Sequence, residues 1–229
     1  MLTRRSLIRL AGALSGALLL PLRAFAAQTV GSAAVVVNAV WAKPESGGRR
    51  SLQQAAPAAF GDTLSTGEES ALIVRFIDNS QLTLGADAEA VIDEFVYAGA
   101  NSSETLTLVK GAFRYISGQI PEEKIAIETP TVTIGVRGTD IKVDVYDDGS
   151  TEMSTVDGAV AVASRVTGEV LSVLTGQSVL SDAEGAFIGG VRDFIHRSAD
   201  EAIERGVDEL KSRLGIPGIP IPLPDLPFP

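Results

Sequence analysis

The chain has 229 residues, no cysteine and a formal net charge of −10, from 19 basic and 29 acidic residues. The absence of cysteine excludes disulfides, thiolate metal ligands and a lipid-modified cysteine. Because phosphate groups are bound mainly through lysine and arginine, so acidic a chain is a poor candidate for binding nucleic acid or an anionic membrane surface.

The first 26 residues have the features of an export signal. A twin arginine, Arg4 and Arg5, precedes an apolar stretch over 10–22 that is too short and too rich in glycine and alanine for a strong membrane span. Ala24 and Ala26 supply the small residues that signal peptidase requires, and the twin arginine is the address of the Tat route. We predict a signal peptide of twin-arginine type over 1–26, and a periplasmic or secreted mature chain without a stable membrane span. The alternatives are a Sec signal that contains two arginines and an uncleaved anchor.

Residues 27–182 are predicted to form an all-β domain. Runs rich in Val, Ile, Thr and Leu alternate apolar and polar positions, with turn signals at 78–80, 100–102, Gly138 and 147–150. Many short strands of this kind indicate a sandwich, a barrel or a solenoid, although no strict repeat identifies a regular parallel β-helix. The apolar positions expected to share buried faces are Leu72, Val74 and Phe76; Leu106 and Leu108; Val132, Ile134 and Val136; and Ile141, Val143 and Val145.

An amphipathic helix is predicted within 183–215, because the period of the apolar residues changes there from two to three or four. Gly215 ends the pattern and Pro217 follows it. The apolar side of this helix could pack on the β domain or bind a partner. Its apolar positions are Val191, Phe194, Ile195, Ala202, Ile203, Val207, Leu210 and Leu214.

The last segment, 216–229, alternates proline with apolar residues and carries almost no charge. Proline at this spacing forbids a helix and favours an extended polyproline conformation. Two interpretations stay open: a disordered end, or a docking segment for an aromatic groove. In the second, the docking residues are Ile219, Ile221, Leu223, Leu226 and Phe228.

No catalytic, metal or cofactor motif is found in the sequence. The single histidine, His196, lies among charged residues of the predicted helix, where it is typical of a solvated side chain. The adjacent acids at 93–94 fall in a predicted strand and point to opposite faces, and those at 147–148 fall in a predicted turn. We therefore predict that the protein is not an enzyme and needs no cofactor.

The most particular stretch is 128–143. It reads as a strand, a tight corner at Gly138 and a second strand, with Pro130 at the start of the first strand. Thr129 precedes the proline, Arg137 precedes the corner, and Thr139 can form a local hydrogen bond after it. These five residues are mostly structural in our interpretation, and Arg137 is the first candidate for a binding role.

This Thr-Pro…Val-Arg-Gly-Thr pattern resembles the FecR domain. Further segments resemble it in the same order, at 61–67, 76–84, 111–114, 156–160 and 174–177, so the resemblance covers about residues 60–180. It implies a solenoid-like or rolled all-β domain of many short strands. FecR regulators hold this domain in the periplasm, where it relays the state of an outer-membrane receptor to an extracytoplasmic-function sigma factor. They carry a cytoplasmic anti-sigma segment and a membrane helix ahead of the domain, and an export signal stands there in this chain.

The sequence therefore predicts an exported, non-catalytic FecR-domain protein that acts as a periplasmic binding or signalling module. Its partner would be an envelope protein or a polysaccharide. One alternative is a polysaccharide-active or polysaccharide-binding envelope protein, and another is a membrane-anchored regulator of a sigma factor system.

Overall fold

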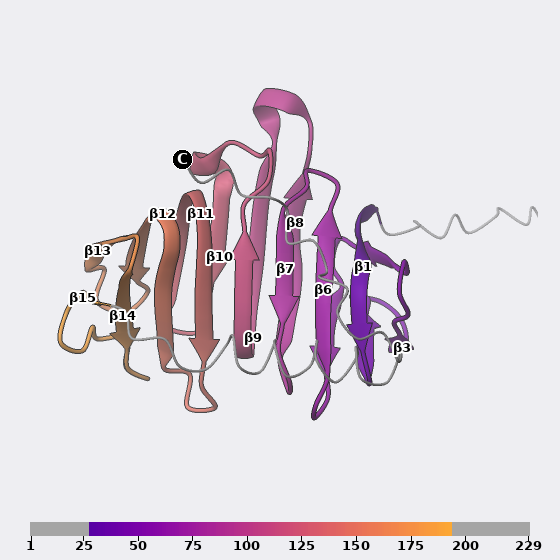
Figure 1. The fold of residues 1–229 in the computed structure, drawn as a ribbon, viewed down its shortest axis with the longest axis horizontal. Coiled ribbons are helices and arrows are strands. Elements are labelled where there is room, and N and C mark those ends of the chain that lie inside the picture. The colour runs from indigo at the N-terminus through magenta and orange to yellow at the C-terminus, as the bar shows by residue number, and fades with distance from the viewer. Residues whose placement is uncertain (1–27, 194–229) are drawn as a thin grey trace, which may run out of the picture.

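The computed structural model describes residues 28–193 (Figure 1). Within that range the chain forms a fifteen-stranded sheet and two short 3-10 helices, with no α-helix, which confirms the predicted all-β class. The strands are β1 (Thr29–Val37), β2 (Val40–Lys43), β3 (Arg50–Ser51), β4 (Pro57–Ala59), β5 (Thr63–Thr66), β6 (Ala71–Phe76), β7 (Gln81–Leu84), β8 (Glu89–Val96), β9 (Ser103–Ile116), β10 (Ile125–Glu128), β11 (Val132–Val145), β12 (Thr151–Ser164), β13 (Val170–Leu174), β14 (Gln177–Ser181) and β15 (Arg192–Asp193), and the 3-10 helices are η1 (Gly99–Asn101) and η2 (Glu122–Lys124).

The predicted signal peptide, most of the predicted helix and the proline-rich tail lie outside the described residues. They include Arg4, Arg5, Ala24, Ala26, His196, Ile219, Ile221, Leu223, Leu226 and Phe228. The start of the predicted helical segment, 183–193, is described and is not helical. It forms turns, a bridge between Ser181 and Phe187, and β15, because the chain first pairs with the edge of the sheet.

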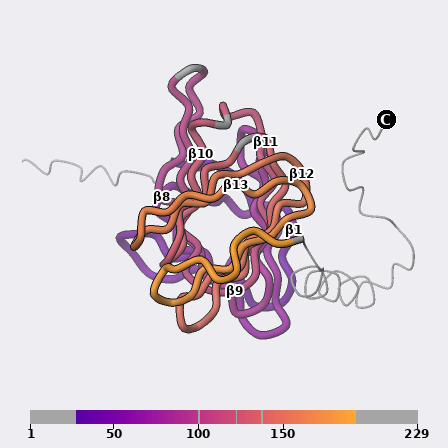
Figure 2. Tube along the Cα trace, turned by 90° about the vertical axis from the view of Figure 1, so that its left-hand side faces the viewer, coloured from indigo at the N-terminus to yellow at the C-terminus, as the bar shows by residue number. Residues whose placement is uncertain are grey.

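The sheet doubles over into two layers. Residues 103–110 of β9 pair with β8 and β10, whereas 111–116 of the same strand pair with β7 and β11. β11 and β12 divide between the layers in the same way. The first layer runs β4-β1-β6-β7-β9-β11-β12-β14-β15, and the second runs β3-β2-β5-β8-β9-β10-β11-β12-β13. Figure 2, which looks along the long axis, shows the chain as a ring around the core.

Three strands pass from one layer to the other without a break. β9, β11 and β12 each span 14 residues, so these strands are longer than the short ones that the sequence predicted. Each bends at a glycine with positive φ: Gly111 at 103°, Gly138 at 53° and Gly158 at 86°. Residues with a side chain rarely adopt such angles, so glycine permits the fold-over. The predicted corner at Gly138 is therefore a bend inside one strand.

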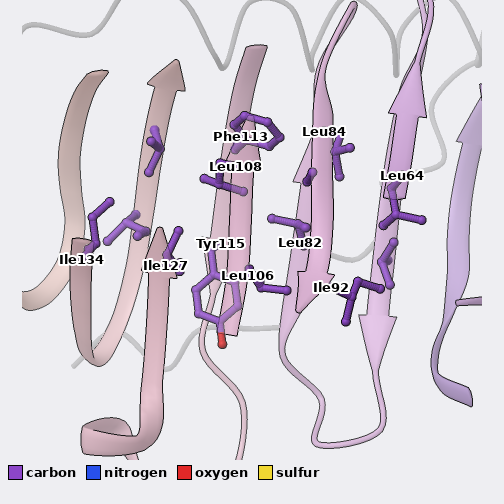
Figure 3. Packing of buried hydrophobic residues seen from close by; sticks show 14 of the residues in the cluster. Leu64, Leu82, Leu84, Ile92, Leu106, Leu108, Phe113, Tyr115, Ile127 and Ile134 are labelled. Carbon is purple, nitrogen blue, oxygen red and sulfur yellow. The ribbon is translucent and has the colours of Figure 1, made fainter. Parts of the chain in front are cut away.

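The core lies between the layers and is almost entirely aliphatic and aromatic. The apolar positions predicted to share faces are all buried, which confirms the period-two pattern. Phe76 of the first layer stacks on Phe95 of the second, with ring centroids 5.0 Å apart and planes 16° from parallel. Figure 3 shows Leu82 and Leu106, one from each layer, in the same cluster. Within residues 28–193 the paired strands are antiparallel except for β9 and β10, so the described chain is not a regular parallel β-helix.

Candidate functional site

Segments that are distant in the sequence meet along one edge of the doubled sheet. We call it the motif edge and define it as residues 77–80, 117–120, 137–140, 157–158 and 174–176. Four of its five segments belong to stretches that carry the sequence resemblance, and 117–120 links two of them. The edge lies along the top of Figures 1 and 2, where the β8–β9 connection also projects.

Backbone hydrogen bonds join the first three segments. The amide of Gln119 donates to the carbonyl of Asp78 at 2.9 Å, and the amide of Ser117 donates to the carbonyl of Thr139 at 3.0 Å. The Thr139 amide in turn donates to Oγ of Ser117 at 2.9 Å. The strap 117–120 thus ties the turn after β6 to the bend of β11.

Two further contacts extend the motif edge toward the C-terminal end of the sheet. Asp140 of β11 is in register with Asp157 of β12, next to Gly158. The amide and hydroxyl of Thr175 both donate to the carbonyl of Gly158, at 3.1 Å and 3.0 Å. The result is one continuous run of turns and bends held by the main chain.

The turn after β6 is built around a buried carboxylate. Asp78 is fully buried, and its Oδ1 accepts hydrogen bonds from the amide and the hydroxyl of Ser80, at 2.9 Å and 2.6 Å. Asn79 has a φ of 70°, the left-handed conformation that asparagine tolerates better than most residues. The strap packs directly on this turn, since a Cβ added at Gly118 would lie 2.3 Å from the Ser80 amide nitrogen.

A second buried acid lies beneath the motif edge. Glu104 of β9 is fully buried, and its Oε2 accepts a 2.6 Å hydrogen bond from the hydroxyl of Tyr115. Its other oxygen, Oε1, has no hydrogen-bond partner. Burial raises the pKa of Glu104 to about 8, the Tyr115 hydrogen bond opposes that rise, and the charge of Asp78 adds to it. Near neutral pH this carboxyl group is therefore mostly protonated and uncharged.

The burial of Glu104 could have been predicted from the sequence. Glu104 stands two residues before Leu106 and four before Leu108, so the alternation that buries those leucines also buries the acid. Burial likewise raises the pKa of Tyr115 well above its ordinary value, and the charge of Glu104 raises it further.

The family-motif residues are divided between opposite edges. Thr129 and Pro130 lie in the connection between β10 and β11, far along the strand from Gly138 and Thr139. Thr129 is fully buried; its Oγ1 accepts hydrogen bonds from the Val132 amide and the Thr151 hydroxyl, at 3.1 Å and 3.0 Å. Pro130 is exposed in the turn and precedes β11 rather than beginning it.

At the other edge, Arg137 is in register with Ala159 just before the bend of β11, and Gly138 is exposed. Thr139 is only 3% exposed, and its Oγ1 has no hydrogen-bond partner. The predicted local hydrogen bond of Thr139 is therefore not formed; its amide donates instead to Ser117, which is distant in the sequence. A binding role for Arg137 stays a prediction.

Large apolar side chains are exposed on the motif edge and beside it. Ile77 is 50% exposed, Tyr97 is 42% exposed and Phe60 is 44% exposed. Tyr97 donates a 2.7 Å hydrogen bond to Oε1 of Gln119 in the strap. The amides of Phe60 and Ile77 donate to the carbonyls of residues 28 and 30, so both residues lie next to the start of β1. Exposed apolar groups gathered at one edge are typical of a protein-binding surface.

The described acids form no metal site, and two of them are paired with arginines. No group of three or more histidines, aspartates and glutamates within 28–193 could hold a metal ion. Asp62 and Asp140 form paired hydrogen bonds with Arg50 and Arg114, at 2.6 Å to 2.9 Å, which are structural contacts between neighbouring elements. Over the same residues, no helix has the length and hydropathy that crossing a bilayer requires.

Residues 62–161 match the family model described as FecR protein, and no curated protein matches the chain. Two crystal structures, each of a candidate anti-sigma factor from Parabacteroides distasonis ATCC 8503, are similar in fold. The first is 14% identical with a TM-score of 0.48, covering 62% of this chain and 62% of that one. The second is 13% identical with a TM-score of 0.48, covering 67% of this chain and 74% of that one. The chain thus spans less than two thirds of the first structure.

Proposed function

We propose that this chain, whose residues 62–161 match the FecR family model, is an exported, non-catalytic binding module that contacts a protein partner through the motif edge, in a signalling role. FecR-type proteins are regulators that act through contacts with other proteins, which favours a protein over a polysaccharide as the partner. If the predicted signal peptide is cleaved, the mature domain is separated from cytoplasmic sigma factors. The partner would then be an envelope protein.

One observation carries the proposal. The motif edge collects most of the family-like segments in one place, held by main-chain hydrogen bonds such as that between Gln119 and Asp78. A rigid scaffold that presents loops is the usual arrangement of binding surfaces. Ile77 and Tyr97 add half-exposed apolar groups to the same edge, and apolar and aromatic residues are the usual anchors of protein interfaces.

Site-specific photocrosslinking in the native host tests this proposal. A photoreactive phenylalanine analogue replaces Tyr97, which contacts the motif edge through Gln119, in one strain and Tyr146 in another. The two tyrosines are matched, at 42% and 46% exposed, and Tyr146 lies beyond β11 at the opposite edge. We expect a discrete protein adduct from position 97 only. Equal adducts at both positions, or none at 97, would contradict the motif edge as the binding surface.

Export is tested separately on the unmodified protein. Cell fractionation and N-terminal sequencing should recover a mature chain that begins after Ala26, outside the cytoplasm. Replacing Arg4 and Arg5 by lysine should block export if the Tat route is used. A full-length chain that is retained at the membrane with residues 1–26 still attached would overturn the predicted cleavage.

A further inference from the structure

A group of buried polar side chains connects the core of the doubled sheet to the motif edge. Its innermost member is Glu104, and the residues in register with it on the paired strands are Phe95 of β8 and Ile125 of β10. Both of these neighbours are apolar and buried. Tyr115, from the other half of β9, donates to Oε2 of Glu104 at 2.6 Å. The acid therefore lies between apolar neighbours, and Tyr115 is its polar contact.

Tyr115 extends this group to the turn after β6. Burial raises the pKa of Tyr115, and the charges of Glu104 and Asp78 raise it further. Contact with the side chain of Ser80 lowers the same pKa. The phenol group thus lies close to both polar side chains of the turn, in which the amide and hydroxyl of Ser80 donate to Oδ1 of Asp78.

Asp78 also holds the strap 117–120 against the turn. Its main-chain carbonyl accepts the 2.9 Å hydrogen bond of the Gln119 amide, and its Oδ2 accepts a longer one, at 3.4 Å, from the amide of Ile120. A Cβ added at Gly118 would lie 2.5 Å from Oδ2 of Asp78, so the contact is close. The Gln119 side chain in turn accepts the hydrogen bond of Tyr97 at the surface. The buried group therefore reaches the outside of the motif edge in a few contacts.

The other elements packed around this group direct apolar side chains toward it. The strap contains no ionisable residue. The residues in register with Tyr115 on β7 and β11 are Leu82 and Ile141, both fully buried. The charged residues next to Phe95 and Ile125 in the chain are exposed: Glu94 and Lys124. Among the described side chains, Asp78 is thus the charge that faces Glu104.

We propose that the proton on Glu104 keeps the strap in contact with the turn, so that its loss loosens the motif edge and weakens partner binding there. Ionised Glu104 would place a second negative charge near Asp78 in an interior of low dielectric, where like charges repel strongly. The Tyr115 hydroxyl donates only one hydrogen bond and cannot neutralise both acids. A shift of the turn toward solvent relieves the repulsion and lengthens its hydrogen bonds to the strap. The effect on binding rests on the proposed function, whereas the loosening does not.

Amide NMR spectra of the full chain between pH 6 and pH 9 test the loosening without a partner. The probes are the amides of Ser80 and Gln119, which both donate to Asp78. The matched reference is Ser150, whose amide and hydroxyl donate to Oδ1 of Asp148 at 2.9 Å and 2.6 Å, as those of Ser80 do to Asp78. We expect the two probes to shift with a midpoint at about pH 8. Their exchange with solvent, corrected for its intrinsic pH dependence, should accelerate at least tenfold, and Ser150 should show neither change.

Two variants assign the titration to the buried group. Glu104→Gln keeps the size of the side chain but cannot ionise, so both probes should stop titrating. Tyr115→Phe removes the hydroxyl between Glu104 and the turn and should reduce the shift at Ser80 at least twofold. The proposal fails if the probes do not titrate in the wild type, or if neither variant differs from it.

Photocrosslinking through position 97 in a host lysate, buffered at pH 6.5 or pH 9, tests the effect on binding. The adduct should fall at least tenfold at the higher pH in the otherwise native chain and stay constant in Glu104→Gln. An equal decrease in both would place the pH response in the partner and overturn the control of binding by Glu104. A missing adduct at both pH values would contradict the proposed function, whereas the NMR titration would still decide whether Glu104 controls the motif edge.

Discussion

The hydroxyl of Tyr115 donates a 2.6 Å hydrogen bond to Oε2 of Glu104 in the closed interior of the doubled sheet, while Oε1 of the same carboxyl group has no partner. Both residues belong to β9, on either side of its bend at Gly111, so one strand supplies both halves of the contact from opposite layers. Burial with one unpaired oxygen favours the uncharged form of this carboxyl group.

The first prediction is a loss of stability as pH rises. The pKa of Glu104 is raised by burial from 4.5 to about 8 in the folded chain, so between these values the folded state binds the proton that the unfolded state has released. The contribution of Glu104 to the free energy of unfolding therefore decreases between pH 4.5 and pH 8, by at most on the order of 5 kcal/mol in total. Above pH 8 it is constant. Urea denaturation of the wild type and Glu104→Gln from pH 5 to 9 measures it. The Gln variant should lack this decrease and should be the more stable protein at pH 9.

The control for that experiment is Glu123→Gln, an exposed acid in η2. Its denaturation profile should run parallel to that of the wild type. If the Glu104→Gln profile is also parallel to the wild type, the buried carboxyl group does not bind the proton as proposed.

The second prediction concerns the close packing of the strap on the β6–β7 turn. In Gly118→Ala the new methyl group would lie 2.3 Å from the Ser80 amide nitrogen and 2.5 Å from the Asp78 carbonyl oxygen, and backbone atoms cannot move aside easily. We expect a loss of about 2–3 kcal/mol in the free energy of unfolding. Gly48→Ala is the matched control, since nothing lies within 4 Å of its added Cβ. Equal stability of the two variants would refute the tight contact.

The third prediction separates stability from binding within the family motif. Thr129→Val keeps the shape of the side chain but removes the oxygen that bonds to the Val132 amide and the Thr151 hydroxyl. Leaving these buried groups unsatisfied should lower the free energy of unfolding by about 1–3 kcal/mol. The folded fraction of this variant should still form the partner adduct through the photoreactive residue at position 97, because Thr129 lies at the edge opposite the motif edge. Loss of the adduct at unchanged stability would instead make Thr129 a binding residue.

Local patterns in the sequence were sufficient to predict part of this fold. Alternation identified the buried positions of β6, β9 and β11, and the turn signal at 78–80 located the turn after β6. The pairing of strands could not be predicted, because it depends on contacts between residues far apart in the chain. The bend of β11 at Gly138 is one case: a glycine before a threonine reads equally as a turn between two strands or as a fold-over within one.

The separation of the family motif could have been predicted. An extended chain rises about 3.3 Å per residue, so Thr129 and Gly138 should be about 30 Å apart. They therefore could not form one site unless a turn intervened. The motif edge itself could not be found in this way, since residues 77–80, 117–120 and 174–176 are brought beside Gly138 only by the tertiary fold.

The last prediction concerns the apolar surface of the motif edge. Ile77 is 50% exposed in the turn after β6, so Ile77→Glu removes little buried area and should change the free energy of unfolding by no more than about 0.5 kcal/mol. A charge there would have to be desolvated in a protein interface, so capture of the partner through position 97 should fall at least tenfold.

Val109→Glu is the control: Val109 is 36% exposed and lies beside Gly111, at the opposite edge. Quantitative crosslinking of the three proteins in parallel, with urea denaturation of each, distinguishes the outcomes. If both variants keep the adduct, the partner does not use Ile77; if both lose it while stable, the motif edge is not the specific surface.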